Sequence, residues 1–425
     1  MPALTDDSHA SDTRAREFFL ARQPILNREQ DLVAYELLFR HAATGPANVV
    51  DDLAATAAVI EHTMALGLDN VLGTMQGYVN VDEAVLMSDI VQFLPADKVV
   101  LEILETVISS PALVERVRVL KEAGYSFALD DVVTQSEHMA DFFPYVKLIK
   151  IDVAGMAAAH LATLSRTFLA AGKVLLAEKV ETIEEFTSCM RLGFTYFQGY
   201  YFARPIILSG KKLAAPQMVL VNLLGLLARD ASSEHIERVI KQEASIGLML
   251  LRLVNTPGAG STRRIDSLGQ ALLILGRQQL QRWLQILLYA QPGQERRAPT
   301  PLLALATTRG KLMELIVQKL RAGERGMADT AFSVGIMSLM DALFGQEMTT
   351  LLTQITVSDD VREALLTRAG VLGELLTLVE SLERVDDTGE TVAATLAQLG
   401  LAAEDLNAMQ LAAFEWSNQL ADSAR

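Results

Sequence analysis

The chain has 425 residues, half of them hydrophobic, so it is long enough for two domains with buried cores. Its 52 acidic and 37 basic residues give a net charge of −15, which argues against nonspecific binding to nucleic acid or to an anionic membrane surface. A specific phosphorylated ligand is still compatible with this charge, because one metal ion or one arginine reverses the sign locally.

The cysteine content and the N-terminus indicate in which cellular compartment the protein is found. A single cysteine, Cys189, excludes an intramolecular disulfide and fits a reducing environment. It lies in the helical pattern FTSCMRLG, which favours a small buried side chain over a nucleophile. Residues 1–16 are polar and lack the apolar core of a signal peptide, and we expect them to be flexible. The sequence therefore predicts a cytoplasmic protein without membrane insertion.

From residue 17 to residue 206, short apolar runs alternate with helical patterns. One helical pattern, SSPALVERVRVLKEAG, begins at Ser110 and Pro111, and another, TIEEFTSCMRLG, begins with a capping box at Thr182. Strands that alternate with helices at this spacing are typical of a parallel sheet. We expect a closed (β/α) TIM-like barrel, with an open doubly wound sheet as the alternative. The apolar runs are GYVNVD, KVVLEILE, YSFALDD, VKLIKIDV, KVLLAEKV and YFQGYYF.

After about residue 212 the strand-like runs give way to amphipathic helical patterns. Examples are SSEHIERVIKQEASIGLMLLRLVN and SLGQALLILGRQQLQRWLQILLYA, and we expect residues 212–425 to form an all-α domain. The glycines in PGAGSTRR follow no strand, which favours a turn between helices over a phosphate-binding loop. The last histidine of the chain is His235, so residues 236–425 cannot build a histidine-based metal site.

Polar side chains recur at the ends of the expected strands. A single acid after a strand is more often a helix cap than a ligand, but polar residues at six strand ends in register are difficult to explain as caps. In a parallel barrel the carboxyl ends of all strands gather on one face, so these residues are expected to converge. They are Asn80, Glu102, Glu105, Asp130, Asp131, Lys150, Asp152, Glu178 and Gln198.

Carboxylates with an amide oxygen suit hard divalent ions such as magnesium or manganese. The adjacent Asp130 and Asp131 could bridge two ions, and two metals about 3.5–4 Å apart are the usual apparatus for phosphodiester hydrolysis. Alternation along VKLIKID places Lys150 on one face with Val146, Leu148 and Asp152. A lysine on such a face is costly unless acidic side chains meet it.

These residues resemble the EAL domain, the family of cyclic di-GMP phosphodiesterases, over residues 17–206. The segment RQPILNREQDLVAYELLFR is similar to the opening pattern of the family through Gln23, Pro24, Glu36 and Arg40. The other matching motifs are VNVD, LEILE, LDD, KID, AEKVET and FQGYYFARP, which carry Asn80, Glu102, Glu105, Asp130, Asp131, Lys150, Glu178, Glu181, Gln198 and Pro205.

The resemblance implies a barrel that hydrolyses cyclic di-GMP to the linear dinucleotide pGpG with magnesium or manganese. It implies that Glu178 acts as a metal ligand or as the base for the attacking water, and that Lys150 holds this water and stabilises developing charge. The metal ligands it implies are Glu36, Asn80, Glu102, Asp130 and Asp131. The substrate contacts are Gln23, Arg40, Gln198 and Pro205, and the supporting residues are Glu105, Asp152 and Glu181.

The sequence departs from the family pattern after Asp131. The family continues D-D-F-G-x-G-Y-S-S-L, whereas this chain reads DDVVTQSEHM and lacks both glycines. In the family this loop helps order the second metal site and couples to dimerisation. Lys179 stands where the family has glycine, and Leu104 stands where threonine is usual. Three functions therefore remain open: a phosphodiesterase, a module that binds cyclic di-GMP without turnover, and a module that binds only protein.

The second half resembles an HDOD domain, a relative of the HD hydrolases without their metal site. The resemblance is carried by LLRLVNTPGAGSTRRIDSLGQALLILG and weakens after about residue 300. It implies a domain that regulates the barrel or docks a protein partner, and a homodimer is compatible with it. The matching residues are Asn255, Ile265, Ser267, Ala271, Leu275 and Gly276.

Overall fold

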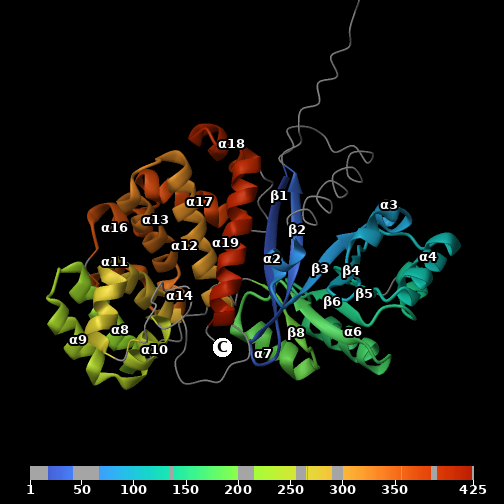
Figure 1. Ribbon diagram of the computed structural model, residues 1–425. Coiled ribbons are helices and arrows are strands. Elements are labelled where there is room, and N and C mark those ends of the chain that lie inside the picture. Colours follow the sequence, from blue (N-terminus) through green and yellow to red (C-terminus); the bar gives the residue numbers. More distant parts are fainter. Residues whose placement is uncertain are drawn as a thin grey trace, which may run out of the picture.

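The protein is described here from a computed structural model in which the first half of the chain forms a closed eight-stranded barrel and the second half is helical (Figure 1). The fold class expected from the sequence is confirmed, and the open doubly wound sheet is excluded. The expected domain limits at residues 206 and 212, and the N-terminal segment 1–16, lie outside the described residues and stay predictions. The structure describes residues 18–41, 67–134, 137–199, 215–254, 265, 267–289, 300–355, 357–383 and 390–423.

The barrel strands follow one another in chain order around the barrel. The strands are β1 (Phe18–Leu26), β2 (Leu32–His41), β3 (Gln76–Val81), β4 (Val99–Ile103), β5 (Ser126–Leu129), β6 (Leu148–Asp152), β7 (Val174–Glu178) and β8 (Tyr196–Phe197). The described helices among them are α2 (Leu68–Leu72), α3 (Glu83–Met87), the 3-10 helix η1 (Asp89–Phe93), α4 (Pro111–Glu122), α5 (Glu137–Phe142), α6 (Ala158–Ala170) and α7 (Ile183–Leu192).

Strand β1 differs from the parallel arrangement expected for the barrel, because it runs antiparallel to both β2 and β8. The reason is the short turn between β1 and β2, since so few residues can join only antiparallel neighbours. The side chain of Asn27 stabilises this turn by accepting hydrogen bonds from the backbone N–H groups of Glu29 and Asp31, at 3.0 and 2.8 Å. Strands β2 to β8 are parallel, so their carboxyl ends meet at one end of the barrel.

The helix boundaries follow the signals in the sequence. Ser110 caps α4 by accepting a hydrogen bond from the backbone of Leu113, and Pro111 occupies the first turn. Thr182 and Glu185 form the expected capping box of α7, and Cys189 is buried within that helix. These local predictions are confirmed. They could be made from the sequence because each depends on residues only a few positions apart.

The barrel interior holds a layer of apolar side chains, and a second core lies between the strands and the surrounding helices. Val146 lies before β6 and packs in the outer core, so the inward-facing alternation of this strand begins at Leu148. The inner layer consists of Ile25, Ala34, Tyr78, Val100, Ala128, Leu148 and Leu176.

The second half is helical throughout its described residues. The pattern around residues 232–254 forms two helices that meet at Glu243, and the longest helix changes direction at Gly276, which has a φ of 67°. The turn expected at residues 257–264 lies outside the described residues. The helices are α8 (Ala215–Ala228), α9 (Ser233–Gln242), α10 (Ala244–Val254), α11 (Leu268–Tyr289), α12 (Pro301–Leu320), α13 (Arg325–Met337), α14 (Met340–Phe344), α15 (Met348–Gln354), α16 (Asp359–Thr367), α17 (Gly370–Glu383), α18 (Glu390–Leu399) and α19 (Ala403–Ser423).

One segment of the described residues, Arg325–Phe344, is long and apolar enough to cross a membrane by length and composition alone. However, 67% of its most apolar window is buried inside the protein, and its side chains belong to the core of the helical half. A core helix gives the same signal, so this segment is weak evidence for a membrane span.

Candidate active site

A polar layer lies directly above the apolar layer of the barrel. On six strands the residue two places after the apolar one is polar, because side chains of a strand point to the same face at every second position. These polar side chains therefore share the barrel interior at the carboxyl ends of the strands. The pairs are Ala34 and Glu36, Tyr78 and Asn80, Val100 and Glu102, Ala128 and Asp130, Leu148 and Lys150, and Leu176 and Glu178.

The ammonium group of Lys150 lies at the centre of this layer, within ion-pair distance of four carboxylates. Its Nζ is 3.1 Å from Glu36, 2.9 Å from Glu102, 2.7 Å from Asp130 and 2.9 Å from Glu178. An ammonium has three protons, so it cannot satisfy four carboxylates at once. If all five groups are ionised, the cluster holds an excess of three negative charges.

The members of the cluster differ in their exposure to solvent. The side chains of Lys150 and Glu102 are fully buried, whereas those of Asp130 and Glu178 are each 11% exposed. A water molecule or a ligand would therefore reach the layer past Asp130 and Glu178.

Two amide side chains hold Glu36 in place. Asn80 Nδ2 donates a hydrogen bond to Oε1 of Glu36 at 3.0 Å, and Gln198 Nε2 donates to Oε2 at 2.7 Å. The amide oxygens of both residues are buried without a hydrogen-bond partner. Sequence reasoning placed Gln198 against the substrate and missed its contact with Glu36, because that contact joins residues 162 positions apart.

The surroundings of these carboxylates favour their protonated forms. Burial, with the repulsion of the neighbouring carboxylates, raises the pKa of Glu102 well above its usual range and that of Glu178 to about 8, although Lys150 opposes both shifts. Burial likewise raises the pKa of Asp130. Protons therefore compensate part of the excess negative charge unless other cations do so.

The residues of this layer fit divalent cations in donor type and charge. Six buried oxygens lack a partner in hydrogen-bond geometry, and oxygen is the donor that hard cations prefer. Within the described part of the chain, no three acids surround a ready metal position. The carboxylates converge on the Lys150 ammonium instead. The six oxygens are Asn80 Oδ1, Glu102 Oε1 and Oε2, Asp130 Oδ1, Glu178 Oε2 and Gln198 Oε1, of which Glu102 Oε1 and Asp130 Oδ1 lie within ion-pair distance of Lys150.

Asp131 lies beside the cluster and pairs with a different lysine. Its side chain is 40% exposed, and its Oδ1 is 3.8 Å from Nζ of Lys179, which also contacts Asp152 at 2.6 Å. Asp131 and Lys179 both have a left-handed backbone, with φ values of 47° and 53°. The strained backbone thus falls at Asp131 itself, while the following Val132 is buried and donates its N–H to the carbonyl of Lys150.

The remaining predicted residues lie around the cluster or outside the described part. Gln23 is paired with Glu36 across β1 and β2, so it faces the same side of the sheet. Glu105 and Glu181 are exposed, and neither carboxylate is among the four around Lys150. The side chain of Arg40 and all of Pro205 lie outside the described residues.

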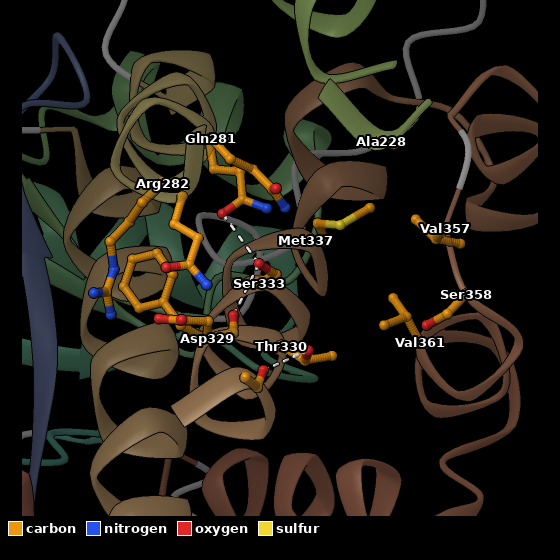
Figure 2. A pocket seen from close by; sticks show the side chains of 14 residues that line it. Ala228, Gln281, Arg282, Asp329, Thr330, Ser333, Met337, Val357, Ser358 and Val361 are labelled. Carbon is orange, nitrogen blue, oxygen red and sulfur yellow. Dashed lines mark hydrogen bonds between the residues drawn. The ribbon is translucent and has the colours of Figure 1, made fainter. Parts of the chain in front are cut away.

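The helical half contains a cavity of about 300 Å³ between α8, α11, α13 and α16 (Figure 2). Glutamines, serines and a threonine line it with apolar side chains, and among the described residues its charged lining side chains are Arg282 and Asp329. Arg282 stacks on Phe332, 3.9 Å from the ring centroid, and pairs with Glu314. Because this cavity gathers no cluster of acids, the barrel layer is the candidate for chemistry.

Family models match both halves of the chain. The model of the EAL domain matches residues 7–205, and the model of the HDOD domain matches residues 213–355. Residues after 355, including helices α16 to α19, lie beyond both matches.

Two relatives are similar along nearly the whole chain. The cyclic di-GMP phosphodiesterase CdgJ of Vibrio cholerae is 31% identical over 407 residues, which cover 95% of this chain and 93% of that protein. The uncharacterized protein YuxH of Bacillus subtilis is 30% identical over 414 residues, covering 95% and 99% of the two chains. A manganese and cyclic di-GMP complex of Klebsiella pneumoniae BlrP1 has a TM-score of 0.37 at 23% identity, covering 47% of this chain and 58% of that one. Because both family models match and the two relatives are 30% and 31% identical along nearly the whole chain, the chain belongs to the family of proteins that join an EAL domain to an HDOD domain.

Proposed function

We propose that this chain is a cyclic di-GMP signalling protein whose barrel hydrolyses cyclic di-GMP to pGpG with Mg²⁺ or Mn²⁺. The observation that carries the proposal is the buried layer of four carboxylates around Lys150, with its excess of negative charge. Membership of the EAL family and the similarity to a phosphodiesterase along nearly the whole chain support it.

The charge of the layer supports a dependence on cations. Cyclic di-GMP carries a negative charge on each of its two phosphodiesters, and an acidic layer would repel it. One lysine does not offset four carboxylates, so the layer attracts phosphate only when further cations are bound. Bound Mg²⁺ or Mn²⁺ would polarise a phosphoryl oxygen and lower the pKa of a bound water.

The side chains have separate roles in this proposal. Glu36, Asn80, Glu102 and Asp130 hold the ions, and Gln198 keeps Glu36 in position. Water forms the new bond to phosphorus while the bond from phosphorus to the ribose 3′-oxygen breaks. Glu178, at the solvent-facing side, takes the proton of the water and returns a proton to the leaving oxygen. Lys150 donates hydrogen bonds to the developing negative charge.

A second candidate function is binding without turnover. The observation that favours it is the pairing of Asp131 with Lys179, since this aspartate was expected to hold a second ion. We propose that cyclic di-GMP binding is retained more fully than hydrolysis. Displacing a metal-binding side chain by about 1 Å lowers the rate on the order of 100-fold.

The helical half has a regulatory or docking role in this proposal, with a protein partner or a second copy of the chain as its ligand. The buried Cys189 and the acidic composition support a cytoplasmic location without binding to nucleic acid.

The proposal is tested by incubating the full-length protein with cyclic di-GMP and Mn²⁺ and measuring pGpG. Hydrolysis should need Mn²⁺ or Mg²⁺ and survive removal of zinc, because the ligands are oxygens. Asp130→Asn should require more Mn²⁺, since it removes one negative charge from the cluster. If the wild type binds cyclic di-GMP but forms no pGpG, the second candidate is correct; if it binds none, both are wrong.

Replacing Lys179 with glycine should raise the hydrolysis rate. The change removes the ammonium that pairs with Asp131 and Asp152 and relieves a left-handed φ of 53°. We expect a rise of about tenfold in kcat with a smaller change in the affinity for cyclic di-GMP, because Asp131 becomes free to hold an ion. Lys179→Ala separates the two causes, since it removes the charge and keeps the strain. An unchanged or lower kcat in both variants would contradict this role of Lys179.

A further inference from the structure

The C-terminal helix α19 lies between the two halves of the molecule and contacts both (Figure 1). Towards the helical half, Ser417 Oγ lies 2.7 Å from Thr307 Oγ1 on α12. Towards the barrel, Leu411 and Phe414 belong to the core that the barrel strands and their helices share. The final helix of the chain is therefore part of the core of the first domain.

Arg22 on β1 contacts this helix through its guanidinium group. Its guanidinium carbon lies 4.4 Å from the ring centroid of Tyr35 on β2 and 4.0 Å from that of Phe414 on α19. The planar group is thus held between an aromatic ring of the barrel and an aromatic ring of α19. Both contacts are favourable for a cation, and the gain is larger where water is excluded.

The hydrogen bonds of Arg22 tie the same elements together. Nη1 donates to the carbonyl of Val71 on α2 at 2.6 Å and to Asn418 Oδ1 on α19 at 3.3 Å, and Nη2 donates to Thr308 Oγ1 on α12 at 3.2 Å. Asn418 in turn donates to the carbonyl of Asn70 at 2.9 Å. One side chain of the barrel therefore bonds to two helices of the second domain.

The positive charge of Arg22 is held in this place without a carboxylate partner among its described hydrogen bonds. In the described part of the chain its hydrogen-bond partners are neutral, and burial lowers the pKa of its guanidinium. A cation without a carboxylate partner is tolerated in such a place only while its N–H donors are hydrogen-bonded and its contacts with the two aromatic rings are kept. A lysine would not replace it, because an ammonium is not planar and has fewer donors.

Arg22 is one residue away from the candidate active site. Along β1 and β2, Arg22 is paired with Leu37, and Gln23 is paired with Glu36. Alternation places Arg22 on the outer face of the barrel and Gln23 with Glu36 on the inner face. The pairing is continuous from Phe18 to Ile25, so a shift of β1 moves the strand that carries Glu36.

We propose that Arg22 is a positioning residue through which α19 fixes β1 and β2, and with them the carboxylate of Glu36 for metal binding. The helical half thereby sets the cation requirement of the barrel site. This inference rests on the function proposed above for that site, and it assigns the coupling to a helix beyond the matched HDOD region.

The test compares Arg22→Ala with Arg116→Ala in the full-length protein. Arg116 is the matched control, because its guanidinium is also half-buried and hydrogen-bonded, in this case to the backbone carbonyls of Leu86 and Ser88, on a part of the barrel away from α19 (Figure 1). In Arg22→Ala, the Mn²⁺ concentration for half-maximal hydrolysis should rise about tenfold, while kcat at saturating Mn²⁺ stays within about threefold. Arg116→Ala should change the Mn²⁺ requirement less than about twofold.

Three further measurements separate positioning from loss of stability. Phe414→Ala should raise the Mn²⁺ requirement as Arg22→Ala does, and the double variant should be no worse than either single one, since both break the same contact. Arg22→Lys should not restore the wild-type requirement. Deuterium uptake over Leu32–His41 should rise in Arg22→Ala and Phe414→Ala and stay unchanged in Arg116→Ala.

The results distinguish this inference from the function on which it rests. A wild-type protein that neither binds Mn²⁺ nor hydrolyses cyclic di-GMP would overturn the proposed function, and deuterium uptake over β2 would still decide whether α19 holds this strand. Uptake in Arg22→Ala equal to that of the wild type would overturn the inference. So would an Arg116→Ala variant with the same rise in Mn²⁺ requirement.

Discussion

Replacing Lys150 with methionine should lower the rate of cyclic di-GMP hydrolysis by about a thousandfold, without weakening Mn²⁺ binding. The variant keeps an unbranched side chain but removes the ammonium that pairs with four carboxylates of the layer. The rate falls because Lys150 no longer stabilises the charge that develops on the phosphoryl group. Mn²⁺ binding is maintained or becomes tighter, because the ammonium no longer competes with the metal for the carboxylates. Hydrolysis and calorimetric titration of Mn²⁺ measure the two effects.

Lys173→Met is the control for this substitution. Lys173 precedes β7 and therefore lies at the opposite end of that strand from Glu178, where its ammonium donates to the carbonyls of Phe143 and Val146. This variant removes a partly buried ammonium from the same barrel and should keep its hydrolysis rate within about twofold. A Lys150→Met protein that retained most of its rate, or that lost rate and Mn²⁺ binding together, would contradict the assigned role.

The metal-free protein should lose stability as the pH rises from about 5 to about 8, by on the order of a few kcal/mol. Burial raises the pKa of Glu178 from its ordinary value of 4.5 to about 8, so between these values the folded state holds a proton that the unfolded state has released. Raising the pH then favours unfolding, and the loss ends above about pH 8. The pKa values of Glu102 and Asp130 are also raised, and these two groups add to the loss of stability with rising pH. Lys150 has a raised pKa and is protonated in both states throughout this range, so it contributes no slope.

The measurement is urea unfolding at several pH values, with a chelator or with Mn²⁺. Mn²⁺ should remove most of the slope, because it replaces the protons as the compensating charge. Glu178→Gln should flatten the slope in chelator and make the protein more stable than wild type at pH 8, while its hydrolysis is severely reduced.

Glu314→Gln provides the comparison for a carboxyl group with the opposite shift. Glu314 is also largely buried, but hydrogen bonds and charge from Arg282 and Lys311 hold its pKa below its ordinary value despite the cost of burial. The stability that Glu314 contributes is present above its ordinary pKa and is lost only in more acidic solution. Glu314→Gln should therefore leave the change of stability between pH 5 and 8 as it is in the wild type. A metal-free wild type whose stability is flat or increases over this range would refute the raised pKa values of the barrel layer.

Much of the barrel and its polar layer could be predicted from the sequence, because both depend on short-range periodicity. Side chains of a strand face the same way at every second residue, and caps such as Ser110 and Thr182 act within one helical turn. Parallel strands then bring Asn80, Glu102 and Lys150 to one end of the barrel wherever they stand in the chain. The sequence by itself therefore determined the fold class and the chemical type of the candidate site.

Only the tertiary structure decided how these groups meet. The antiparallel direction of β1, the contact of Gln198 with Glu36, and the pairing of Asp131 with Lys179 depend on how the barrel closes. The contact of Arg22 with α19 joins residues 396 positions apart, and no local pattern indicates it. Its physical basis is the packing of two aromatic rings against a half-buried cation, and those rings become neighbours only after both domains have folded.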